Sequence, residues 1–336
     1  MVYNSLTEAP RNLKEGIDWL IALRGTDAKK NIIALGSAVY DLLADAPVGN
    51  MKLPTLEEVK LITKEFLEKP EIKGRWFASR LLQKFNEPRR TPNLHFKRLF
   101  NKYKSDYHNV VQKKELQRKD MGLYLGRVVY GCDTLVKHMK VPDQYESAYS
   151  SEASWDASCS RHPAACAVVF VGIAPMLYAG LYSLKYVTSI ALTNESNNTV
   201  RERLAELLSA VGYDESYRRP RMKISYIFEA LKDVDKDVLD ILYDFSGFWA
   251  FYGLESSVSE GETSEETTVR TKTRKFYMGQ MIKHGIPGVD VDMGLLHAWN
   301  TKHNNKPSKI HNALGSGNMY YPGTPTVSDL GAAIPL

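Results

Sequence analysis

The sequence predicts an all-α fold: a multi-helix bundle built round a central apolar helix, with a disordered C-terminal tail. Three observations predict it. Apolar residues recur at three- and four-residue spacing through about the first 250 residues, strand-like alternation is almost absent, and residues 163–184 carry no formal charge. Because the amphipathic segments need an apolar surface to pack against, we expect the uncharged segment at the centre of the bundle.

The first two helices have clear start and stop signals. Pro10–Leu23 places its apolar residues at helical spacing, and Gly25 follows as a stop. Asp27 is the expected N-cap of the second helix, whose apolar stripe covers residues 32–43 and which ends before Pro47.

Three more helices are expected before residue 119. Thr55 and Glu58 have the spacing of a capping box, and the helix that they begin extends to about Lys69. The next covers Trp76–Phe85, and the third begins at residues 91–92, where a threonine cap precedes a proline. The stripe of this third helix consists of Phe96, Leu99, Phe100, Tyr103, Tyr107, Val110 and Val111.

The helical pattern continues to residue 252 and then stops. Helices are expected over Asp120–Lys140, Thr199–Val211 and Arg221–Phe245, while 141–160 is rich in Ser, Tyr and Ala and indicates an ordered loop or a sub-boundary. We therefore assign residues 1–252 to a helical bundle domain.

Residues 253–336 differ in composition from the bundle. Glu255–Glu266 contains five glutamates and no basic residue, which is typical of a solvated linker. Thr267–His284 is compatible with one short helix, and Gly, Pro, Asn and His dominate from Gly285 onward. We expect an acidic linker, a short helix and a largely disordered tail.

The uncharged segment Pro163–Leu184 has two interpretations. As a helix its residues would span roughly 33 Å, enough to cross a bilayer. Gly172, Pro175 and Gly180 interrupt it, and Ala, Tyr and Ser make up much of the rest, which favours a helix buried among its neighbours over a membrane span. The charges that flank it do not orient it in a membrane.

Cysteine usage leaves three interpretations open. Cys132, Cys159 and Cys166 are the cysteines of the chain, and Cys159-x2-His162-x3-Cys166 has a spacing found in metal sites, although a structural zinc site needs a fourth ligand. In an extracellular chain, Cys159 and Cys166 are candidates for a disulfide. Otherwise both are small buried residues at the start of the apolar helix. No metal site is expected.

Positive charge is concentrated in one part of the chain. The net charge is +5, yet residues 73–119 contain 14 Lys/Arg and three acidic residues, a local charge of +11. The aromatic residues there share one helical stripe, so the charges are expected to face water, and an anionic glycan or an acidic protein surface is the alternative partner. Nucleic acid is not expected. The candidate contact residues are Lys97, Arg98, Lys102 and Lys104.

Motifs that carry catalysis are absent from the sequence. It contains no GxSxG elbow, no Walker A loop, no HExxH and no GxGxxG after a predicted strand. We expect a non-enzymatic protein with no catalytic residues and no cofactor. Asn194 and Asn197 stand in N-glycosylation patterns, whose use requires a secretory route.

Three blocks resemble a known family. They are Leu6–Leu20, Pro163–Leu184 with its Gly-Leu-Tyr core at residues 180–182, and Leu207–Asp214. Together they are similar to the variant erythrocyte surface antigens of Babesia-type blood parasites, and the likeness extends from about Leu6 to Tyr252. The cysteine-rich region, coiled coils and C-terminal membrane span of the larger members are not seen, so the chain resembles a truncated or divergent member.

The resemblance implies a surface antigen or adhesin module that acts in antigenic variation and cytoadhesion. It implies export to the infected erythrocyte surface, a second antigen subunit, and a host endothelial receptor or anionic glycan as partners. Met1–Glu8 lacks the apolar region of a secretory signal, which by itself indicates the cytosol but is general in that family. The alternative function is an intracellular helical scaffold or nucleic-acid-binding protein that uses the basic stretch 73–119.

Overall fold

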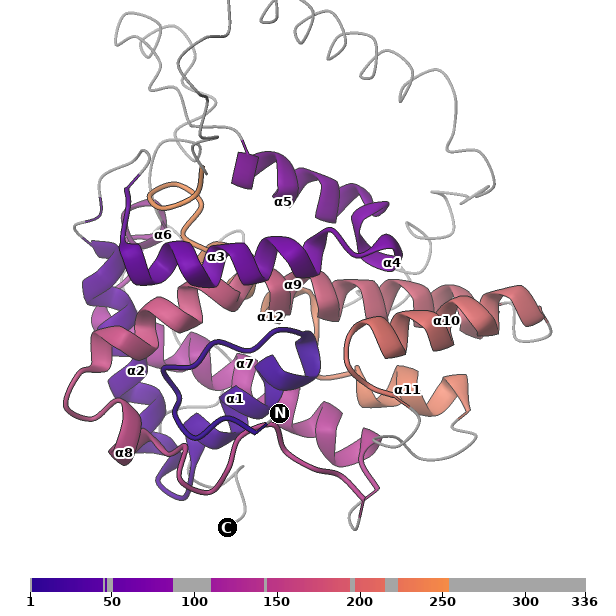
Figure 1. The fold of residues 1–336 in the computed structure, drawn as a ribbon, viewed down its shortest axis with the longest axis horizontal. Helices are drawn as coiled ribbons and strands as arrows, with labels where there is room; N and C mark the ends of the chain where they lie inside the picture. The colour runs from indigo at the N-terminus through magenta and orange to yellow at the C-terminus, as the bar shows by residue number, and fades with distance from the viewer. Residues whose placement is uncertain are drawn as a thin grey trace, which may run out of the picture. The chain divides into compact units, whose positions relative to one another are not determined.

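The computed structural model describes residues 2–44, 46, 51–86, 110–141, 144–193, 197–214 and 223–253, all of which belong to one compact unit. Within these residues the fold is all-α, as predicted, and the only strand-like contact is an isolated parallel bridge between Tyr3 and Tyr149. The helices (Figure 1) are α1 (Leu13–Arg24), α2 (Ala28–Ala44), α3 (Pro54–Leu67), α4 (Pro70–Lys73), α5 (Trp76–Asn86), α6 (Val110–Lys114), α7 (Arg118–Met139), α8 (Trp155–Ser158), α9 (Pro163–Thr193), α10 (Asn198–Ala210), α11 (Ile224–Ala230) and α12 (Lys236–Phe245).

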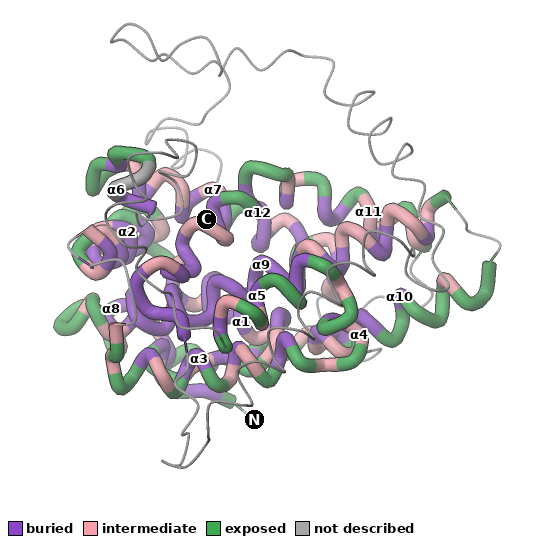
Figure 2. Tube along the Cα trace, turned by 90° about the horizontal axis from the view of Figure 1, so that it is seen from above, coloured by how far each residue is buried: buried purple, intermediate pink, exposed green. Residues whose placement is uncertain are grey.

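Helix α9 is the centre of the bundle, as predicted for Pro163–Leu184. Helices α1, α2, α3, α10, α11 and α12 all pack against it, and every residue from Cys166 to Leu181 is buried (Figure 2). Among the described residues it is the one helix long and apolar enough to cross a membrane, and most of its apolar length is enclosed by the other helices. A helix that is apolar all round is stable in water when it is surrounded in this way.

Two glycines allow the neighbouring helices to approach α9 closely. A Cβ atom on Gly172 would lie 2.5 Å from Val59 Cγ1 of α3, and one on Gly180 would lie 3.0 Å from Leu13 Cβ of α1. Real Cβ atoms do not approach as closely as the contact at Gly172, and a Cβ atom on Gly180 would require Leu13 to shift by a few tenths of an ångström. The glycines that interrupt the apolar stretch in the sequence are therefore packing positions.

Pro175 lies inside α9 without ending it. Proline has no N–H, so the Val171 carbonyl loses its usual helical donor four residues later. The Tyr252 hydroxyl lies 3.0 Å from this carbonyl and donates a hydrogen bond to it. It also lies 3.2 Å from the Gly172 carbonyl, which accepts a further bond from the Thr63 hydroxyl at 2.7 Å. Side chains from outside the helix thus satisfy the backbone around the proline.

Some helix ends differ from the sequence prediction. Helix α3 begins at Pro54 without a side-chain cap, so the capping box predicted for Thr55 and Glu58 is wrong, because proline at the first position already sets the helical backbone. A capping box does form at Gln117 and Asp120, at the start of α7.

The stripe predicted as one helix over 221–245 is two helices, α11 and α12. They are separated by a turn in which Asp235 caps α12 by accepting a bond from the Val238 N–H at 2.8 Å. The predicted helices beginning at residue 91 and over 267–284 lie wholly or largely outside the described residues, and so does the predicted tail.

Candidate functional site

The predicted site residues fall into two groups. Pro163, Gly172, Pro175, Gly180 and Leu184 all belong to α9, and the last four of them are buried. Their roles in the described structure are therefore packing roles. The candidate anion-contact residues Lys97, Arg98, Lys102 and Lys104 lie outside the described residues.

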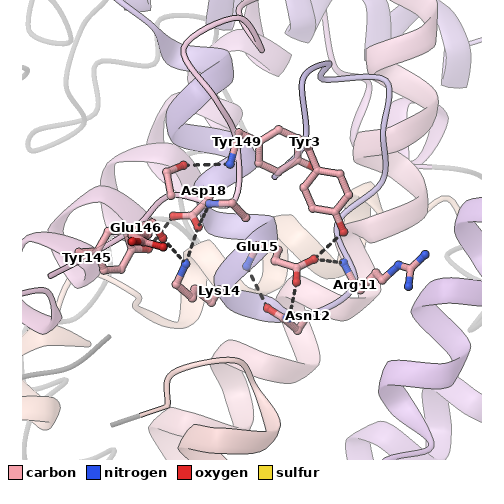
Figure 3. A network of polar contacts seen from close by, with 11 residues as sticks. Tyr3, Arg11, Asn12, Lys14, Glu15, Asp18, Tyr145, Glu146 and Tyr149 are labelled. Atoms are coloured by element: carbon pink, nitrogen blue, oxygen red, sulfur yellow. Dashed lines mark hydrogen bonds and ion pairs between the residues drawn. The ribbon is translucent and has the colours of Figure 1, made fainter. Parts of the chain in front are cut away.

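A network of charged and polar side chains is centred on Asp18 of α1 (Figure 3). This carboxylate is 2% exposed, and its Oδ2 atom is 2.9 Å from Lys14 Nζ and 2.9 Å from the Ala148 N–H. The Tyr145 hydroxyl donates to its other oxygen at 2.5 Å. Two charges are stable when buried only if each is paired and hydrogen-bonded, and both conditions hold here.

Lys14 links the same carboxylate to the loop that precedes α8. Its Nζ atom donates to the Glu146 carbonyl at 2.7 Å and lies 4.6 Å from the centre of the Tyr145 ring. We call Lys14, Asp18 and residues 145–149 the clasp, because they fasten α1 to this loop.

A second carboxylate, Glu15, extends the network toward the N-terminus. Its Oε2 atom accepts from the Tyr3 hydroxyl at 2.9 Å and from the Arg11 N–H at 2.7 Å. Asn12 caps α1 through its bond from the Glu15 N–H at 3.0 Å, and the Tyr3 ring stacks on Tyr149 with centroids 4.8 Å apart. The Tyr3 N–H also donates to the Ala148 carbonyl at 2.8 Å, so Tyr3 is bonded both to α1 and to the 145–149 loop.

Two tyrosines of the clasp, Tyr145 and Tyr149, have hydroxyl pKa values raised above the ordinary value. Burial, together with the nearby negative charge of Asp18, raises the pKa of the Tyr145 hydroxyl above its ordinary value. Burial also raises the pKa of Tyr149, whose hydroxyl donates to the Glu8 carbonyl at 2.7 Å. Both hydroxyls therefore keep their protons at neutral pH and donate hydrogen bonds, Tyr145 to Asp18 and Tyr149 to the Glu8 carbonyl.

Cys159 and Cys166 form a disulfide with their Cα atoms 5.9 Å apart. It closes the turn between α8 and α9. The residue before Cys159, Ser158, accepts a bond from the Leu6 N–H at 3.0 Å, which ties this turn to the N-terminal segment. His162, between the two cysteines, bonds the Cys159 carbonyl through its backbone N–H.

Across the described residues there is no group of three His, Cys, Asp or Glu side chains placed to hold a metal ion. The remaining cysteine, Cys132, is buried, and burial raises the pKa of its thiol to about 12.

A second surface combines aromatic and arginine side chains where the start of α5 packs against α9. Trp76 is 57% exposed and stands edge-on to Tyr182, with ring centroids 6.0 Å apart. One turn along α9, the Tyr186 ring lies 5.4 Å from the Arg75 guanidinium. Arg75 and Arg203 of α10 both line a small pocket of about 200 Å³ beside it. We call Arg75, Trp76, Tyr182, Tyr186 and Arg203 the aromatic–arginine surface.

The chain matches no protein-family model, no curated protein and no solved structure.

The sequence predicts neither the clasp nor the aromatic–arginine surface as a site. Lys14 and Asp18 were visible as an i,i+4 pair of opposite charge inside the block Leu6–Leu20, but such pairs are usually exposed. Nothing in the sequence indicates that the 145–149 loop covers this pair. Trp76 was placed on a helix, and its exposure depends on the helices that pack around it.

Proposed function

We propose that the chain is a non-enzymatic surface antigen or adhesin module, displayed on parasite-infected erythrocytes and acting in antigenic variation and cytoadhesion. The observation that carries the proposal is the resemblance of Leu6–Leu20 to the opening motif of the variant erythrocyte surface antigens. Its partners are a second antigen subunit and a host endothelial receptor or anionic glycan.

The arrangement of the block Leu6–Leu20 supports this proposal. Its polar residues are used within the fold: Asn12 caps α1, Lys14 and Asp18 belong to the clasp, and the Trp19 indole N–H bonds the Leu6 carbonyl at 2.8 Å. A block with this structural use is expected to stay constant while other surfaces of an antigen vary, since a change at a buried polar position destabilises the whole fold.

The disulfide also supports an extracellular location. Disulfides persist in oxidising compartments and are rare in the cytosol, where thiols are kept reduced. The Cys159–Cys166 bond therefore favours display over the alternative of an intracellular scaffold or nucleic-acid-binding protein. Part of the basic stretch on which that alternative depends, residues 87–109, lies outside the described residues.

Protease treatment of intact infected red cells tests the display. We expect an antibody against the folded unit to lose its target after the treatment, while an internal parasite protein in the same cells persists. A chain that survives on intact cells and disappears only after the cells are permeabilised contradicts display at the surface.

Adhesion is tested separately with the purified chain on endothelial cells. Charge reversal at Lys97, Arg98, Lys102 and Lys104 should weaken attachment if the basic stretch contacts an anionic partner. Attachment that is unchanged in these variants removes that stretch from the proposal, and a chain that does not attach removes the adhesin role.

A further inference from the structure

Trp76 exposes more apolar surface than its place in the bundle requires. It is the largest of the exposed large hydrophobic residues in the described part of the chain, the others being Val2, Ile33, Leu61 and Tyr130. Its ring is held by edge contacts to Phe77 at 5.7 Å and to Tyr182 at 6.0 Å. Exposed tryptophan beside other aromatic rings is enriched in binding surfaces, where its large side chain supplies contact area.

The neighbouring aromatic rings extend this surface along α9. Tyr182 and Tyr186 are four residues apart and so lie on the same side of the helix, and both are partly exposed. The Arg75 guanidinium covers the Tyr186 ring at 5.4 Å. Stacking of this kind fixes the guanidinium while its outward N–H groups stay available to a ligand.

The pocket beside Arg75 is lined by two arginine residues, Arg75 and Arg203. It is lined by Pro70, Glu71, Gly74, Arg75, Arg203, Glu206 and Leu207, from the α4–α5 turn and α10. Figure 1 shows α4 and α10 meeting beside the C-terminal half of α9. Among the described residues, neither Arg75 nor Arg203 forms an ion pair with a carboxylate.

Two arginines and two glutamates line the pocket, and the electrostatics of Arg75 favour an anion placed beside its guanidinium. Burial lowers the pKa of the Arg75 guanidinium, and the positive charge of Arg203 acts in the same direction. An oxyanion between the two guanidinium groups would relieve this repulsion and accept several charge-assisted hydrogen bonds. Glu71 and Glu206, in the same lining, are acceptors for hydroxyl groups.

We propose that the aromatic–arginine surface binds a sulfated polysaccharide. A sulfate group lies between Arg75 and Arg203, a sugar ring stacks on Trp76, and the two glutamates accept bonds from sugar hydroxyls. This deepens the proposed function, because it names the chemical class of the anionic partner and places its binding site. The two carboxylates oppose a continuous phosphate chain or an anionic membrane, whereas a polysaccharide presents sulfate and hydroxyl groups together.

Binding of heparin to the full chain, measured by calorimetry, tests this surface. We expect Arg203→Gln to weaken binding about tenfold, since it removes one charge-assisted contact. Trp76→Ala should also weaken it, by severalfold. The matched controls are Arg161→Gln, an exposed arginine before the opposite end of α9, and Tyr130→Ala, an exposed aromatic residue on α7. Both controls should bind as the unaltered chain does.

Other ligands distinguish the proposed partner from its alternatives. Heparin stripped of its sulfate groups should not bind, and vesicles containing phosphatidylserine should not compete with heparin. The proposal is overturned if the Arg203→Gln and Trp76→Ala variants bind heparin normally, or if desulfated heparin binds the protein as well as heparin does. It is also overturned if the vesicles compete with heparin. It is also overturned if charge reversal at residues 97, 98, 102 and 104 removes all binding while Arg203→Gln has no effect.

Helicity measured by circular dichroism checks that each variant is folded, and the exposed position of Arg203 makes its replacement tolerable. The outcome is separable from that of the display experiment. Loss of heparin binding leaves protease sensitivity on intact cells unchanged, and a chain that is not displayed still binds heparin in vitro if this surface is correct.

Discussion

The Tyr252 hydroxyl donates to the Val171 carbonyl, the one that Pro175 deprives of its helical N–H. The two residues are 81 positions apart in the chain, and their contact joins the C-terminal end of the described bundle to its central helix. The Tyr252 side chain is almost fully buried, with its ring packed edge-on to Phe85 at 4.6 Å. A proline in the middle of a core helix is tolerated here because this side chain replaces the lost donor.

Tyr252→Phe should lower the free energy of unfolding by about 1–2 kcal/mol, because it removes the hydrogen bond and leaves a buried carbonyl unsatisfied. In a Pro175→Ala background the backbone N–H at position 175 is available to Val171, so the same change should cost less. Urea unfolding of the unaltered chain, the two single variants and the double variant gives the coupling free energy between positions 175 and 252. It should reach at least about 0.5 kcal/mol. Equal costs in the two backgrounds would contradict the role assigned to Tyr252.

Gly172→Ala should destabilise the bundle by about 1–3 kcal/mol, because its Cβ atom would lie 2.5 Å from Val59 Cγ1. Val59→Ala introduced with it should recover part of the loss. Gly74→Ala is the control, since a Cβ atom there meets nothing within 4 Å. The close helix contact would be refuted if Gly172→Ala unfolded at the same urea concentration as Gly74→Ala.

Sequence patterns predicted the bundle well because its main determinants are local. The spacing of Leu13, Ile17 and Leu20 by itself indicates a helix with one apolar face. The lack of charge in α9 by itself indicates a helix that other helices surround. The roles of Pro175 and Asp18 were not predictable in the same way. Each depends on a partner more than 75 residues away, and periodicity carries no information about such pairs.

The candidate site was less predictable than the fold for the same reason. Trp76 and Tyr182 lie in ordinary helical segments of the sequence, and only the packing of α5 against α9 shows that Trp76 stays exposed. Cys159 and Cys166 lie close together in sequence, so their disulfide was among the expected alternatives. The basic residues at 97–104 lie outside the described part of the chain, and their role stays a prediction.

Asp18→Asn should destabilise the protein by about 3–5 kcal/mol, because the buried Lys14 ammonium loses its counter-charge. Urea unfolding at neutral pH measures the effect. Asp156→Asn is the matched control: this carboxylate also pairs with a lysine, Lys30, but its side chain is 74% exposed, and we expect a change below about 0.5 kcal/mol. Similar small effects of the two substitutions would argue against the clasp as a source of stability.

Removal of the disulfide by Cys159→Ser together with Cys166→Ser should lower the free energy of unfolding by about 2–3 kcal/mol, because the unfolded chain gains the freedom of a short loop. Titration of thiols in denaturant provides a direct check on the unaltered chain. One reactive thiol, that of Cys132, is expected without a reducing agent and three with it. Three thiols in the unreduced protein would show that the bond does not form.

Alkaline conditions should destabilise the fold through its buried tyrosines. An unfolded tyrosine loses its proton near pH 10, whereas burial holds the pKa of Tyr145 and Tyr149 above that value in the folded state. Above about pH 10 the folded chain therefore binds more protons than the unfolded chain, and the free energy of unfolding falls as pH rises. Below that pH the contribution of these tyrosines is fully present.

Other buried groups affect the same pH range, in both senses. Cys132, with its pKa raised from 9.0 to about 12, adds to the alkaline loss, while Lys60, with its pKa lowered by burial, opposes it below pH 10.5. The test therefore compares the pH dependence of the unfolding free energy between a variant and the unaltered chain. Tyr145→Phe should show a shallower fall in unfolding free energy between pH 10 and pH 11 than the unaltered chain. Parallel profiles would mean that Tyr145 ionises equally in both states and is not enclosed by the clasp.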